Sequence, residues 1–180
     1  MPSPLPNFQR LITGHSKDGK SILVADEQAP WDDNVEGGNA AFSLAYTTSS
    51  TPVDMNADND LSKYRDYLVK PPGLVEKGGS VLRFVDMAPG IISPMHRTVS
   101  IDYGIVILGR VELVLDSGET KVMEPGDVCV QRGTMHAWRN ASQTEWARMM
   151  YVLQPSLPVE IEGKPLEEEL SHMKGVRKSS

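Results

Sequence analysis

The second half of the chain is divided into short β-prone segments by residues that favour turns. These segments alternate apolar and polar side chains or are rich in β-branched residues, and they span residues 81–87, 101–108, 111–115, 120–123, 128–131, 136–140 and 148–154. Asp116-Ser117-Gly118 and Glu124-Pro125-Gly126 supply tight turns between them. Many short strands at such regular spacing predict an all-β fold, either a sandwich or a closed barrel.

The first 75 residues are less regular. Two β-prone runs flank an Asp-Gly pair within residues 11–24, which is a strong hairpin signal, and we expect this hairpin to add edge strands to the barrel. Residues 40–48 alternate large apolar with small or polar side chains and predict another strand, whereas residues 26–39 have turn composition. Residues 51–75 are rich in Asp, Pro and Asn and lack strand periodicity, so they could cover the barrel mouth as a lid.

The end of the chain has a different pattern. No helix of three turns is predicted before Pro165, but Leu166, Leu170 and Met173 share one face of a helix and predict a short amphipathic helix in the tail. We therefore divide the chain into N-terminal strands and a loop packed on the barrel (residues 1–75), a barrel core (residues 76–158) and a C-terminal tail (residues 159–180).

Composition narrows the class of protein. At 180 residues the chain has the length of one domain and can bury a core without disulfides. Its single cysteine, Cys129, and the lack of an apolar leader-like run suit the reducing cytoplasm, where a packed thiol is the expected state. A net charge of -6 argues against nucleic-acid binding, and no run approaches the roughly 18 apolar residues that span a membrane.

Two motifs within the predicted barrel place histidines at defined spacing. The first runs Gly90-x5-His96-x-Thr98-x3-Asp102-x6-Gly109, and the second contains Gly126, Gly133, His136 and Asn140. In this order and at this separation they resemble the paired motifs of the cupin superfamily. Thr98 stands where the family's second histidine usually sits, Asp102 replaces its glutamate, and Gln131 replaces a proline of the second motif. The resemblance implies a single-domain cupin jelly-roll β-barrel.

The resemblance also implies a metal site reduced from four ligands to three, namely His96, Asp102 and His136. Two imidazoles and a carboxylate would hold a divalent Zn, Fe, Mn or Ni ion and leave positions open for substrate. Aspartate is one methylene shorter than glutamate, so the alternative is a metal-free barrel in which the histidines line the cavity and Asp102 forms an acid–base pair with one of them.

Other side chains near the motifs are candidates for contact with a substrate. Arg83 and Tyr103 are predicted to act in catalysis beside Asp102 and His136. An inward-facing Arg83 would hold a carboxylate or phenolate, whereas an outward-facing one would be solvated. Substrate contacts are also predicted for Arg97, Thr98, Gln131, Trp138 and Arg148, although Trp138 could equally be a packing residue.

The motif sequences look like those of stand-alone cupins of fungal and bacterial natural-product pathways, which implies an enzyme acting on a small molecule. We expect a metal-assisted, non-oxidative lyase, cyclase or isomerase, of the dehydratase or decarboxylase type, acting on an oxygenated polyketide-like or aromatic intermediate. The alternatives are an Fe(II)-dependent dioxygenase using the same residues and a non-catalytic small-molecule-binding cupin. We further expect a homodimer, because the N-terminal hairpin offers an exposed edge.

Overall fold

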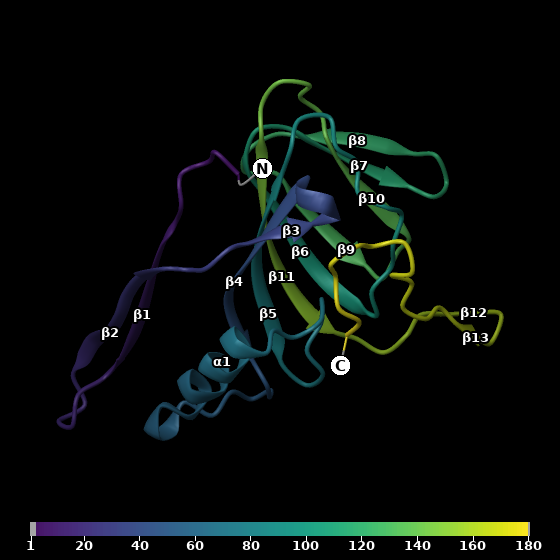
Figure 1. Ribbon diagram of the computed structural model, residues 1–180. Helices are drawn as coiled ribbons and strands as arrows, with labels where there is room; N and C mark the ends of the chain where they lie inside the picture. The colour runs from purple at the N-terminus through teal and green to yellow at the C-terminus, as the bar shows by residue number, and fades with distance from the viewer. Residues whose placement is uncertain (1–2, 180) are drawn as a thin grey trace.

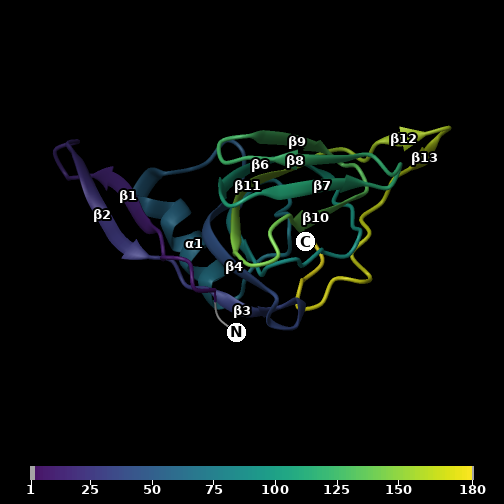
Figure 2. The ribbon, with the colours of Figure 1, turned by 90° about the horizontal axis from the view of Figure 1, so that it is seen from above.

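The computed structural model describes residues 3–179 and is built mainly from antiparallel strands in two facing sheets. The larger sheet has six strands in the order β3-β4-β5-β11-β6-β9, and the smaller has three in the order β10-β7-β8. Seen from above, the two sheets curve around a common interior (Figure 2). The all-β jelly-roll prediction is thus confirmed.

The strands keep close to the segments expected from the sequence. They are β1 (Gln9–His15), β2 (Ser21–Gln28), β3 (Asp32–Val35), β4 (Ala40–Thr48), β5 (Ser80–Met87), β6 (Ser100–Leu108), β7 (Val111–Leu115), β8 (Thr120–Met123), β9 (Val128–Arg132), β10 (His136–Asn140), β11 (Ala147–Pro155), β12 (Glu160–Ile161) and β13 (Lys164–Pro165). Two short 3-10 turns, η1 (Glu36–Gly38) and η2 (Asn56–Asp58), and one helix, α1 (Asn59–Val69), complete the described elements.

The core forms where the apolar faces of the two sheets meet. Met87, Val106 and Met149 from the larger sheet pack with Val111 and Trp138 from the smaller one. Alternate residues of a strand face the same side, so each strand contributes every second side chain to this interior. The strand alternation in the sequence therefore has a direct counterpart in burial.

The N-terminal part differs from expectation in two ways. β1 and β2 form the predicted hairpin, but it is a separate two-stranded sheet that projects from the barrel as an arm rather than adding edge strands to it (Figure 1). Residues 26–39 are not all turn, because β2 continues to Gln28 and β3 follows. β4 pairs with β5, so the larger sheet begins well before residue 76.

Helix placement was also predicted wrongly. The helix is α1, which packs beside β4 within the 51–75 segment and buries Leu61 and Tyr64. The tail contains no helix among its described residues, since β12, β13 and turns occupy it. Leu170 is instead buried in the core, and a backbone bridge between Arg97 and Glu169 holds the tail extended. No helix within residues 3–179 is long and apolar enough to cross a membrane.

A buried ion pair joins the larger sheet to the N-terminal segment. Arg148 Nε lies 2.6 Å from Asp86 Oδ1 and Arg148 Nη2 lies 2.7 Å from Asp86 Oδ2, across neighbouring strands. Arg148 Nη1 donates to the carbonyl of Pro6 at 2.7 Å, and Ser3 Oγ donates to Asp86. Both charges are satisfied by this bidentate geometry, which makes loss of one partner costly.

We expect Asp86→Ala to lower the free energy of unfolding by about 3–5 kcal/mol, because it leaves the buried guanidinium without its counter-ion. Urea denaturation of the variant measures this. Glu112→Ala is the matched control, since it breaks the more exposed Arg139–Glu112 pair and should cost at most about 1 kcal/mol. Equal effects of the two substitutions would contradict the assignment.

The projecting arm formed by β1 and β2 has exposed apolar side chains that could form the interface of the predicted homodimer. Leu11 and Leu23 on it are 58% and 59% exposed, which leaves apolar surface without a cover in one copy of the chain. We propose that the arm packs against a second copy. Light scattering should give twice the 19.8 kDa mass of one chain, and Leu11→Glu with Leu23→Glu should halve it. A monomeric mass for the unaltered protein would refute the dimer.

Candidate functional site

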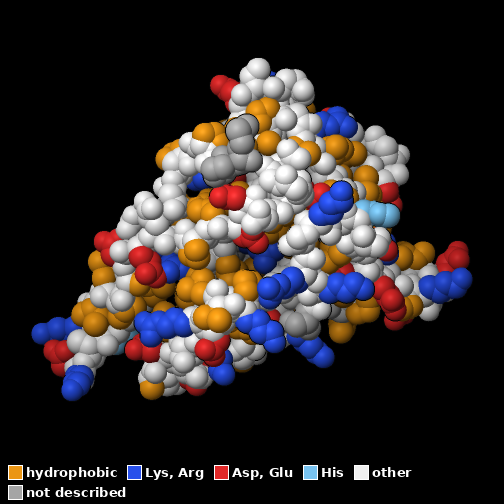
Figure 3. All heavy atoms as spheres, viewed as in Figure 1, with side chains coloured by type: hydrophobic (Ala, Val, Ile, Leu, Met, Phe, Trp, Pro, Cys, Tyr) orange, Lys and Arg blue, Asp and Glu red, His pale blue; other side chains and the backbone are white. Residues whose placement is uncertain are grey.

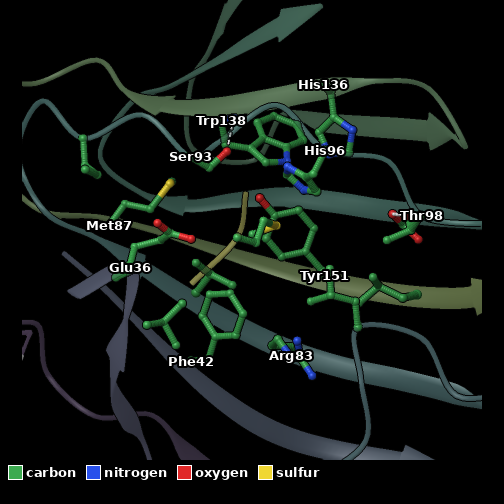
Figure 4. A pocket seen from close by; sticks show the side chains of 18 residues that line it. Glu36, Phe42, Arg83, Met87, Ser93, His96, Thr98, His136, Trp138 and Tyr151 are labelled. Carbon is green, nitrogen blue, oxygen red and sulfur yellow. Dashed lines mark hydrogen bonds between the residues drawn. The ribbon is translucent and has the colours of Figure 1, made fainter. Parts of the chain in front are cut away.

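A cavity lies inside the barrel, and His96, Asp102 and His136 line it. Its empty volume, which includes space open to solvent, is about 750 Å³. Most of its wall is apolar, and the polar groups gather in a few places (Figure 4). The lining residues are Val35, Glu36, Ala40, Phe42, Leu74, Arg83, Val85, Met87, Ile91, Ser93, His96, Thr98, Asp102, His136, Trp138, Tyr151, Leu153 and Met173.

Reciprocal backbone hydrogen bonds bring the two motif histidines together. His96 N donates to His136 O at 2.8 Å, and His136 N donates to His96 O at 2.9 Å, which forms an isolated antiparallel bridge. Residues paired in this way project their side chains to the same side of the sheet. The two imidazole centroids consequently lie 4.3 Å apart.

Both histidines are held in one tautomer. His96 Nδ1 lies 2.9 Å from the carbonyl of Pro94, and His136 Nδ1 lies 2.9 Å from the carbonyl of Thr134. A carbonyl oxygen only accepts, so each Nδ1 carries the proton and each Nε2 presents a lone pair. Burial lowers the pKa of His96, and burial together with neighbouring His96 lowers the pKa of His136 to about 3. Both imidazoles are therefore neutral at pH 7.

Asp102 is the buried carboxyl group of the cavity. Its Oδ1 accepts from Ser100 Oγ at 2.6 Å, and its Oδ2 accepts from Thr98 Oγ1 at 3.3 Å. Burial raises the pKa of Asp102 to about 6, against the opposing effect of the two hydroxyl groups. A carboxyl group that titrates near neutrality can both take up and release a proton under physiological conditions.

The structure brings six of the predicted site residues to this cavity. They are Arg83, His96, Thr98, Asp102, His136 and Trp138. Trp138 makes edge contacts with the rings of His136 and Tyr151, at centroid distances of 5.6 and 5.9 Å, so it serves both as packing and as cavity wall.

Four of the predicted site residues lie outside the cavity lining, namely Tyr103, which was predicted to be catalytic, and the predicted substrate contacts Arg97, Gln131 and Arg148. Tyr103 is 37% exposed on the outer side of β6, because it alternates with Asp102. Arg148 forms an ion pair with Asp86, and Arg97 Nε donates to the carbonyl of Glu167 in the tail. Gln131 is buried, but its side chain bonds to Thr134 rather than facing the cavity. These positions correct the expectation that the four side chains meet a substrate directly.

Sequence reasoning also missed cavity residues that come from outside the motifs. Glu36 reaches the cavity from η1, and its Oε1 accepts from the backbone N–H of Lys174 at 2.8 Å. Tyr151 lies on the inward face of β11, and burial raises the pKa of its phenol well above the usual range. Its parity with Leu153 on β11 could have identified Tyr151, whereas Glu36 follows a turn-rich segment with no readable period.

The expected three-ligand metal set does not form. His96 and His136 fit as ligands, because both are neutral, present Nε2 and have Nδ1 fixed by a carbonyl. Within residues 3–179, however, no three His, Cys, Asp or Glu side chains are grouped so that they could hold a metal ion. Asp102 is instead bonded to Ser100 and Thr98. Among the described residues, the imidazole donors grouped in the cavity are the pair His96 and His136, which falls short of the expected three ligands.

Comparisons with known proteins agree with the fold and the motifs. A cupin-domain model matches residues 83–153. The chain is 48% identical to phomopsin biosynthesis cluster protein D of Diaporthe leptostromiformis, over 87% of this chain and 83% of that one. It is 41% identical to oryzines biosynthesis cluster protein J of Aspergillus oryzae, covering 94% of each chain. It is also 41% identical to the cupin-domain-containing oxidoreductase fogC of Aspergillus ruber, over 91% of this chain and 80% of that one. The chain belongs to the family of cupin-domain proteins.

Proposed function

We propose that this cupin-domain protein is a small-molecule biosynthetic enzyme that moves protons without net oxidation. The reaction class is that of a lyase, cyclase or isomerase acting on an oxygenated polyketide-like or aromatic intermediate. One observation carries the proposal: an apolar cavity is lined by two neutral imidazoles whose Nε2 atoms carry no proton, together with a buried carboxyl group of pKa about 6.

The three groups have distinct roles in this proposal. Asp102 removes a proton from carbon next to a substrate carbonyl and later returns it to an oxygen leaving group or to another carbon. The Nε2 atoms of His96 and His136 accept hydrogen bonds from substrate hydroxyl or enol groups, because neither carries a proton there. Ser100 and Thr98 orient the carboxylate by bonding one oxygen each.

The apolar wall supports this chemistry. Phe42, Met87, Trp138 and Leu153 line the cavity and limit the water around the reacting groups. In such surroundings hydrogen bonds to a developing enol are stronger than in water. The same desolvation keeps the imidazoles neutral and makes Asp102 a stronger base than an exposed aspartate.

The relatives support a role in small-molecule biosynthesis, since two of them take their names from the phomopsin and oryzine biosynthesis clusters. They also favour a second candidate function. fogC of Aspergillus ruber and virC of Hypocrea virens are named cupin-domain-containing oxidoreductases, at 41% and 42% identity. An Fe(II)-dependent oxidation would need ligands beyond the histidine pair, for instance from the substrate. A binding protein without catalysis is the third candidate.

Oxygen dependence separates the first two candidates. The probe is an aromatic β-hydroxy ketone, whose dehydration needs removal of one α-proton and loss of the hydroxyl group as water. We expect dehydration at equal rates with and without oxygen, measured by absorbance of the conjugated product. Turnover that consumes oxygen, stops when oxygen is removed and is increased by added Fe(II) would contradict the non-oxidative proposal. Tight binding of the probe without any product would favour the binding protein.

The pH dependence tests the role of Asp102. A general base works when deprotonated, so kcat/KM should rise as the pH passes through about 6 and then level off. Asp102→Asn should lower kcat by about 10²–10⁴-fold and remove this rise. Tyr103→Phe, a substitution on the outer side of β6 and outside the cavity lining, is the control and should change neither. A profile unchanged in Asp102→Asn would exclude Asp102 as the proton carrier.

A further inference from the structure

A second cavity adjoins the first. Its empty volume is about 860 Å³, again including space open to solvent, and it lies between α1, residues 71–73, β3 and the C-terminal tail. Val35, Phe42 and Arg83 line both cavities, so these three side chains form the wall between them. On the molecular surface, hydrophobic side chains gather between α1 and β3, with Lys and Arg side chains beside them (Figure 3).

Arg83 occupies this wall with most of its hydrogen-bonding capacity unused. It is 7% exposed and faces inward from β5, with the same parity as Val85 and Met87. Its Nη2 donates to the carbonyl of Gly73 at 2.9 Å, and its guanidinium lies 5.1 Å from the ring centroid of Phe42. Within residues 3–179 no carboxylate pairs with it. A guanidinium has five N–H donors, so several remain for a ligand.

A buried cation without a counter-ion is costly for the folded protein. Burial lowers the pKa of Arg83 to about 10, so the group still carries its charge at pH 7. Arg148, by contrast, forms a bidentate ion pair with Asp86. Arg83 therefore has no carboxylate partner among the described residues, whereas Arg148 has the carboxylate of Asp86.

We propose that Arg83 binds the carboxylate of an organic-acid substrate whose apolar body lies in the cavity with His96, Asp102 and His136. Arg83 lies on the opposite side of this cavity from the histidine pair, with Phe42 beside it and Tyr151 between it and the histidines in this view (Figure 4). The carboxylate is thus held at one end, and the reacting carbon is presented to Asp102 and the imidazoles. That such an acid is also turned over rests on the function proposed above; the binding itself does not.

The second cavity reaches Arg83 from the side of the wall that faces α1 and the tail. Arg177 lines this cavity from the tail, where its Nη1 donates to the carbonyl of Pro71 at 3.1 Å. Asp32 also lines it and contributes a carboxylate. Basic side chains near an opening raise the local concentration of anions and their association rate. Arg177→Gln is therefore expected to slow association of a carboxylate without changing which head group is preferred.

Two probes that differ only in charge test the proposal, namely 4-phenylbutyrate and its uncharged amide, titrated calorimetrically. The unaltered protein should bind the carboxylate about tenfold to a hundredfold more tightly. Arg83→Gln should abolish that preference while leaving the amide affinity unchanged, and Arg83→Lys should retain part of it, because an ammonium cannot form the planar fork. Arg110→Gln, which removes an exposed charge outside both cavities, is the control.

Several results would overturn the proposal. Equal affinity for the two probes, no carboxylate binding, a preference that persists in Arg83→Gln, or equally strong competition by sulfate would each do so. The comparison of the two probes on the unaltered protein stands even if Arg83→Gln does not fold. A carboxylate preference lost in Arg83→Gln, in a protein that shows no proton-transfer activity, would keep this binding site and remove the proposed function.

Discussion

The antiparallel bridge between His96 and His136 is the interaction on which the candidate site depends. Its two backbone hydrogen bonds join the segment before β6 to β10, and so place residues from both motifs at one end of the barrel interior. The carbonyls of Pro94 and Thr134 then fix each ring through Nδ1. The position and the tautomer of both rings therefore follow from contacts with the backbone.

Burial acts on the site in one consistent way. It disfavours charge, so the histidines lose their protons and Asp102 keeps its proton to a higher pH. Arg83 remains charged, because even a lowered guanidinium pKa stays well above neutrality. The cavity thus combines neutral hydrogen-bond acceptors, a buried carboxyl group able to exchange a proton and a buried cation, with the carboxyl group of Glu36 also on its wall. This combination suits an oxygenated, acidic small molecule.

Much of this arrangement could be predicted from the sequence. Strand alternation and turn residues located the barrel strands, and motif spacing identified His96, Asp102 and His136, because these signals are local in the chain. Three features depended on contacts distant in sequence and could not be read. Leu170 packs into the core from an extended tail, Glu36 enters the cavity from a turn, and Arg148 pairs with Asp86 on a neighbouring strand. Parity alone also left the direction of Arg83 open.

The proposed site requires His96 and His136 to be neutral and protonated at Nδ1, with Nε2 available to a ligand. Long-range ¹H–¹⁵N correlation spectra of the two imidazoles test it directly at about pH 7, with His96→Gln and His136→Gln to assign the signals. We predict an Nδ1–H tautomer and an unprotonated Nε2 for both rings. An imidazolium, or a proton on Nε2 of either ring, would contradict the account.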